Sequence, residues 1–168
     1  MSIESIVNLG DDQMANQFVM SIPGGIPTGG NDESVSLRMQ ESFPMPDDGG
    51  GEYEIIYQGL KILKPNMSDA MDKHFEIVVR TDQQWKVYND LKTWKSAVYN
   101  NVLGTKLPHA LTATTIVVQA LDGQKDVVKT FTFNYCWLQK IKAMDFSHTE
   151  EGPATVTLTF IFGYMEED

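Results

Sequence analysis

The stretch KHFEIVVRTDQQWKVYNDLKTWKSAVYN (residues 73–100) decides the fold, because its hydrophobic period changes halfway along. Phe75, Ile77 and Val79 alternate with more polar neighbours, which is the period of a half-buried strand. Thr81-Asp82 then offers a helix N-cap, and apolar side chains recur every three or four residues after it. That stripe consists of Trp85, Tyr88, Leu91, Trp94 and Val98. The stretch therefore predicts a strand that runs directly into a helix.

The two faces of the predicted helix differ in character. One face carries the apolar stripe, in which we expect Trp85, Leu91 and Trp94 to pack on a sheet. The other face carries Lys86, Lys92 and Lys95 and should meet solvent or a partner. Core packing is the favoured interpretation of the stripe, and contact with a second subunit is the alternative.

The rest of the chain reads as strands separated by turns rich in glycine and proline. We expect residues 65–66 to turn the chain after the fourth of these strands. Residues 154–163 alternate most clearly and should bury four apolar side chains. The fold class predicted is mainly β, a β-barrel or sandwich of antiparallel strands with one substantial α-helix. The expected strands are 17–22, 34–40, 52–58, 60–63, 112–121, 126–135 and 154–163.

Composition limits the function classes. A chain of 168 residues fits one domain, 1–168, with a core of ordinary size. The net charge of −10 argues against nucleic-acid binding, because such a surface repels phosphates. The single cysteine, Cys136, excludes an internal disulfide and should be a buried, inert thiol. No secretory signal and no apolar run long enough for a membrane helix are recognisable.

Motifs of catalytic or metal sites do not emerge from the sequence. His74, His109 and His148 are widely separated, and none belongs to a metal-binding or nucleophile motif. The glycine-rich segment 24–30 lacks the lysine that a phosphate loop requires. The carboxylates of residues 47–54 lack the spacing of a calcium loop. We therefore predict no catalytic residue, no metal and no cofactor, and expect a protein that is not an enzyme. Long alternating strands leave open sheet edges, which favours assembly.

The order of these parts resembles the tail tube proteins of contractile-tailed bacteriophages, the T4-like tube family related to the type VI secretion ring protein. The resemblance extends over nearly the whole chain, with residues 1–15 as an N-terminal extension before the first strand. It rests on residues 16–22, 35–46, 53–57, 74–79, the helix after Asp82 with Trp94 late in it, and 154–160.

The resemblance implies a homohexameric ring in which the sheets of the subunits join, and rings that stack into a hollow tube inside a contractile sheath. The implied partners are further copies of the chain, the tail sheath protein, a tube initiator or baseplate, and a tape-measure protein in the lumen. Genome DNA would pass through during ejection without sequence-specific binding, and an acidic wall would not trap it. The implied location is the virion tail, after assembly in the cytoplasm of the bacterial host.

The resemblance also implies roles for particular residues. The carboxylates of Glu41, Glu52 and Glu54 become candidates for the lumen wall. Lys86, Lys92 and Lys95 become available to acidic neighbours in the next subunit or the sheath. The loop expected to stack the rings comprises Ser42, Phe43, Pro44, Met45, Pro46, Asp47, Asp48, Gly49, Gly50 and Gly51.

Two structural alternatives share this fold: a tube-initiator or baseplate hub protein, and an effector-carrying ring of a contractile injection system. An enzyme with a site assembled from scattered residues is the third alternative. Long tubes seen by electron microscopy would favour the tube protein, and isolated hexameric rings would favour the effector carrier.

Overall fold

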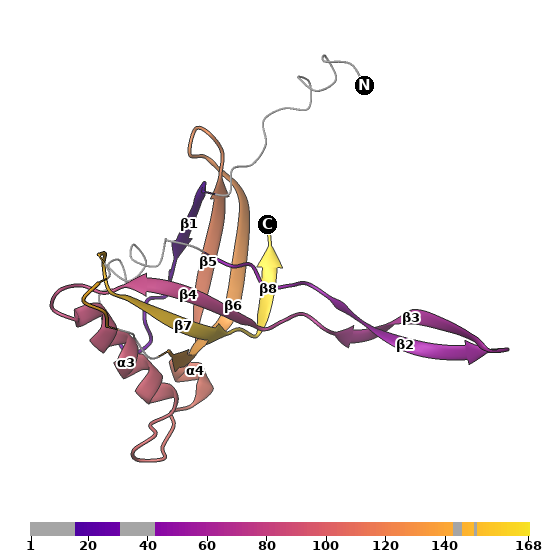
Figure 1. Cartoon of the computed structure of the whole chain (residues 1–168), viewed down its shortest axis with the longest axis horizontal. Coiled ribbons are helices and arrows are strands. Elements are labelled where there is room, and N and C mark those ends of the chain that lie inside the picture. Colours follow the sequence, from indigo (N-terminus) through magenta and orange to yellow (C-terminus); the bar gives the residue numbers. More distant parts are fainter. Residues whose placement is uncertain (1–15, 31–42, 143–145, 150) are drawn as a thin grey trace.

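The computed structural model describes residues 16–30, 43–142, 146–149 and 151–168 (Figure 1). The expected strand 34–40 and the N-terminal extension 1–15 lie outside these residues. The described chain is mainly β, with antiparallel sheets and one substantial helix, as predicted. Its elements are β1 (Phe18–Ser21), β2 (Gly50–Tyr57), β3 (Leu60–Asp69), β4 (His74–Arg80), α3 (Lys86–Val98), α4 (His109–Thr112), β5 (Thr114–Leu121), β6 (Val127–Ile141), β7 (Thr155–Ile161) and β8 (Tyr164–Glu167).

The main sheet has the strand order β1-β5-β6-β7-β4, and β8 also pairs with β6. The long strand β6 makes this possible, because residues 131–134 pair with β8 whereas residues 137–141 pair with β7. The strands β4 and β7 run across the direction of β1, β5 and β6 (Figure 1). The sheet therefore bends into two halves, with β1, β5, β6 and β8 in one of them.

The core lies where these strands turn their apolar sides toward α3. Phe75, Ile77 and Val79 of β4 are buried, which confirms the alternation predicted for this strand. The Phe75 ring stacks 5.5 Å from the Phe160 ring of β7, measured between centroids. The four side chains expected to be buried in the last long strand are all buried: Val156, Leu158, Phe160 and Phe162.

The helix begins later than the sequence predicted. The backbone N–H of Trp85 donates to the Asp82 carbonyl, and Trp85 adopts a left-handed φ of 58° immediately before α3. The Asp82 carboxylate still accepts from a helical N–H, that of Val87 at 3.2 Å. Residues 82–85 therefore form a turn, and the predicted N-cap at Thr81-Asp82 is wrong in position.

A bulge in β6 changes which side chains face the core. Phe133 and Tyr135 would share a face in a regular strand, but Phe133 and Cys136 are the buried pair. Tyr135 has a φ of 56°, and the register with β5 shifts between Thr114 and Ile116 at this point. The extra residue re-aims the strand, so the Tyr135 side chain is exposed.

The strand β3 continues through the residues that were expected to turn. Pro65 lies opposite Glu52, next to a register shift in β2, where a missing N–H is tolerated. The side-chain amide of Asn66 donates to the Glu52 carbonyl at 3.2 Å and replaces part of the ladder. The turn predicted at 65–66 is therefore wrong, and the real turn is at Gln58-Gly59.

Candidate assembly surfaces

A two-stranded hairpin of β2 and β3 projects from one side of the body (Figure 1). Its two-residue turn uses Gln58 and Gly59, whose φ angles of 50° and 79° suit a type I′ turn. Nearly every residue of both strands is exposed. An isolated two-stranded ribbon is at best marginally stable in water, so this hairpin is a candidate for contact with another chain.

The two faces of the hairpin differ in polarity. Directly opposed residues of an antiparallel pair share a face, so the register assigns each side chain to one of the two faces. One face carries the Glu54 carboxylate and the Lys61 ammonium, 2.6 Å apart, beside Ile56 and Leu63. The other face, which we call the apolar hairpin face, comprises Tyr53, Ile55, Tyr57, Leu60 and Ile62, with Lys64 opposite Tyr53 at its end nearest the body.

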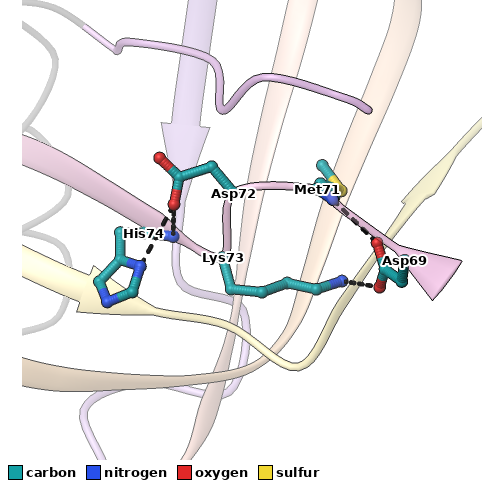
Figure 2. Close-up of polar contacts among 5 residues, drawn as sticks. All are labelled: Asp69, Met71, Asp72, Lys73 and His74. Atoms are coloured by element: carbon teal, nitrogen blue, oxygen red, sulfur yellow. Dashed lines mark hydrogen bonds and ion pairs between the residues drawn. The ribbon is translucent and has the colours of Figure 1, made fainter. Parts of the chain in front are cut away.

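The root of the hairpin is tied to the body by polar contacts (Figure 2). The Lys73 ammonium lies 2.8 Å from the Asp69 carboxylate at the end of β3. The hydrogen bond from Lys73 to this carboxylate holds the pKa of Asp69 below its ordinary value. The ion pair therefore persists to acidic pH and is lost as the pH falls through the pKa of Asp69 in the folded protein. The Asp72 carboxylate accepts from the His74 N–H at 3.0 Å and lies 3.2 Å from the His74 Nδ1.

The residues before β2 form a strap against this root. Phe43 packs 5.2 Å from the Phe75 ring, and the Gly49 carbonyl accepts from Ala70 N–H at 3.2 Å. Of the loop expected to stack rings, Ser42 lies outside the described residues, and Phe43 to Gly49 form this strap. Gly50 and Gly51 belong to β2 instead. A side chain at Gly51 would collide with Asn66 and Ser68, so the close approach of the two strands requires glycine there.

The sheet half with β1, β5, β6 and β8 has two outer edges. Among the described residues, no strand pairs with the outer side of β1 or of β8. The four strands alternate in direction, because β1 pairs antiparallel with β5, β5 with β6, and β6 with β8. A β1 strand from one copy could thus add to β8 of another in antiparallel pairing, and the alternation would continue.

The other residues singled out in the sequence are the expected lumen carboxylates and the expected core and lysine residues of the helix. Glu52 and Glu54 lie on the hairpin, and Glu41 lies outside the described residues. Leu91 and Trp94 are buried against the sheet, whereas Trp85 is half-buried beside Tyr88 and Phe146 and precedes the helix. The lysines Lys86 and Lys92 are exposed, and Lys95 is half-buried with its Nζ 3.4 Å from the Tyr99 carbonyl.

The sequence predicted strands at 52–58 and 60–63, but neither the full length of β3 nor the pairing of the two strands into a separate hairpin was anticipated. The signal was present in Gln58-Gly59, which separates two β-rich runs. The turn was expected at Pro65-Asn66 instead, because proline usually ends a strand.

Cys136 is unavailable for chemistry at the surface. Burial raises the pKa of its thiol to about 12, and its Sγ lies 3.2 Å from the Phe133 carbonyl, to which it donates. The thiol therefore stays protonated at physiological pH. A thiol reagent at pH 8 is expected to leave the folded protein unlabelled and to label one thiol per chain in denaturant. Rapid labelling of the folded protein would contradict this assignment.

Among the described residues, no helix is long and apolar enough to span a membrane.

Comparison with known proteins relates the fold to contractile injection systems. No family model matches the chain, and no curated protein matches it. A chain from the sheath and tube terminator of PVC, an extracellular contractile injection system, superposes with a TM-score of 0.68 at 11% identity, covering 95% of this chain and 99% of that one. A chain from the PVC sheath-tube complex gives a TM-score of 0.63 at 11% identity, covering 100% and 99%. A chain from the baseplate of the anti-feeding prophage gives 0.66 at 10% identity, covering 94% and 96%. At these identities the likeness establishes a shared fold.

Proposed function

We propose that this chain is a structural subunit of the tube in a contractile injection system. The observation that carries the proposal is the four-stranded antiparallel half-sheet, whose edges β1 and β8 are both open among the described residues. Joining β1 of one copy to β8 of the next is a heterologous contact, and such contacts close into rings when the rotation fits. The shared fold with chains of sheath-tube and baseplate complexes supports this role.

In the proposed assembly, six copies form one ring and rings stack into a hollow tube surrounded by a sheath. The strands would then make one closed barrel, which removes the exposed edges. The chain acts as a single domain with no catalytic role, and its partners are further copies, the sheath and the baseplate. The exposed lysines Lys86 and Lys92 of α3 are proposed for contact with acidic neighbours.

We propose that the face of the half-sheet opposite the core lines the channel. Its side chains are mostly uncharged and polar, among them Gln119, Thr130, Thr132 and Asn134, and Glu166 adds a carboxylate. The Glu166 Oε2 accepts from the Asn134 amide at 3.1 Å. Glu41, Glu52 and Glu54 stay candidate lumen carboxylates, and Glu166 joins them. Genome DNA of a phage is the expected cargo because the net charge of −10 would not retain it; an effector is the alternative.

The oligomeric state tests this function. Native mass spectrometry of the concentrated protein is expected to find a six-copy ring, and negative-stain microscopy is expected to find tubes formed from such rings. Rings that never lengthen would favour the effector carrier, and caps at one tube end would favour a terminator or initiator. A protein that forms only closed dimers, both alone and after mixing with baseplate extracts, would contradict the proposal.

A further inference from the structure

The apolar hairpin face needs a partner that the described part of the chain does not supply. Tyr53, Ile55, Tyr57, Leu60 and Ile62 are all more than a third exposed. A patch of this kind on an extended ribbon marks an interaction surface. The opposite face is divided between the Glu54–Lys61 ion pair and two exposed apolar side chains, Ile56 and Leu63, so the apolar hairpin face is the more apolar of the two.

The root of the hairpin lies beside the edge formed by β8. The Lys73 carbonyl, between β3 and β4, accepts from the Phe162 N–H at 3.1 Å. The Lys73 ammonium lies over the Phe162 ring, 5.6 Å from its centroid. Phe162 is joined to the first residue of β8, Tyr164, by Gly163 alone. The hairpin thus leaves the body at the β8 edge and extends away from β1 (Figure 1).

Hydrogen bonds join the two legs of the hairpin at its root. The N–H of Ala70 donates to the Gly49 carbonyl at 3.2 Å, and the N–H of Asp72 donates to the Asp47 carbonyl at 3.1 Å. The Lys73–Asp69 ion pair braces the segment that leads from β3 into β4 (Figure 2). The root is thus closed across both legs, and the Lys73 carbonyl and the Phe43 ring join it to Phe162 and Phe75 of the body.

We infer that the hairpin clasps the neighbouring copy within the same ring, namely the copy whose β1 joins β8. This inference rests on the proposed ring. A copy added at the β8 edge stands on the side toward which the hairpin extends, so the hairpin reaches across it and buries the apolar hairpin face on it. The hairpin accordingly strengthens each ring joint, in addition to any contact it makes between stacked rings.

Hydrogen exchange in isolated rings tests the inference. Rings separated from tubes by size exclusion, monomers and complete tubes are compared by mass spectrometry over residues 50–69. Exchange in this segment is expected to be roughly tenfold slower in isolated rings than in monomers, because docking suppresses local opening. Protection that appears only in tubes would place the contact between rings and overturn the inference. Absence of any ring would overturn the proposed function itself, and this inference with it.

Two neighbouring substitutions supply the matched control. Ile55→Lys puts a charge on the apolar hairpin face, whereas Ile56→Lys puts the same charge on the opposite face. The concentration at which rings dissociate is expected to rise at least roughly tenfold for Ile55→Lys and to stay near the unmodified value for Ile56→Lys. Equal effects of the two variants would contradict docking through the apolar face. Both side chains are exposed in the single chain, so neither change should unfold it.

Discussion

Replacing Trp94 with alanine is expected to lower the free energy of unfolding by about 3–5 kcal/mol, the range for a large buried aromatic residue. Trp94 is fully buried, and its ring lies 5.6 Å from that of Phe160. Its Nε1 donates to the Thr112 carbonyl at 2.8 Å, so the same side chain joins α3 to α4 and to β7. Urea denaturation of the monomer measures the effect.

Two further variants test the hydrogen bond of Trp94 and the core face of α3. Trp94→Phe keeps most of the packing but leaves the Thr112 carbonyl without its donor, which should cost about 1–3 kcal/mol. Trp85→Ala should cost less than Trp94→Ala, because Trp85 is half-buried and lies outside the helix. If Trp85→Ala proved as damaging as Trp94→Ala, the assignment of the core face of α3 would be wrong.

Replacing Glu167 with proline is expected to abolish ring formation while the subunit stays folded. Thr130 and Asp168 exchange both backbone hydrogen bonds, at 3.0 and 2.9 Å. Because an antiparallel ladder alternates, the N–H of the preceding residue, Glu167, points away from β6 toward the open edge. Proline removes that N–H and obstructs a strand from another copy, yet it is tolerated at an edge.

The control for this variant is Glu167→Ala. The Glu167 carboxylate lies 3.0 Å from the Lys129 ammonium in an exposed ion pair, and alanine removes this pair while it keeps the backbone N–H. Glu167→Ala should therefore form rings, and Glu167→Pro should remain monomeric in sedimentation with an unchanged circular dichroism spectrum. Rings formed by the proline variant would show that β8 does not pair with β1 of a neighbouring copy.

Alternation was sufficient to predict the strands that are buried on one side. The core faces of β4 and β7 follow from their period of two, because each strand packs one side on the core and pairs regularly along its length. The helix was likewise predictable from its stripe, and Leu91 and Trp94 are at its buried centre. Local pattern and tertiary structure agree in these elements.

The errors occurred where tertiary pairing overrides local preference. The bulge at Tyr135 arises where β6 leaves β8 and begins to pair with β7, which no local pattern records. Trp85 takes a left-handed φ that is rare for a bulky residue, so the turn before α3 could not be anticipated. Pro65 is accepted in β3 because the ribbon is two-stranded and open on that side.

The candidate assembly surfaces were only partly predictable for a related reason. Strand alternation implied open edges, but the identity of β1 and β8 as the outer strands depends on long-range pairing. The loop expected to stack rings was placed at residues 42–51 from its glycine and proline content, and its role stays a proposal; residues 43–49 form the strap and Gly50–Gly51 begin β2. Of these glycines, Gly51 is the one that the close approach of β2 and β3 requires.

Electron cryomicroscopy of the assembled protein tests the central claim most directly. At a resolution that separates strands, the account predicts a ring in which β1 of each copy is hydrogen-bonded to β8 of the next, so that the half-sheets form one continuous barrel around a channel. A particle in which β1 and β8 stay unpaired, or in which copies associate only through the α3 surface, would contradict it.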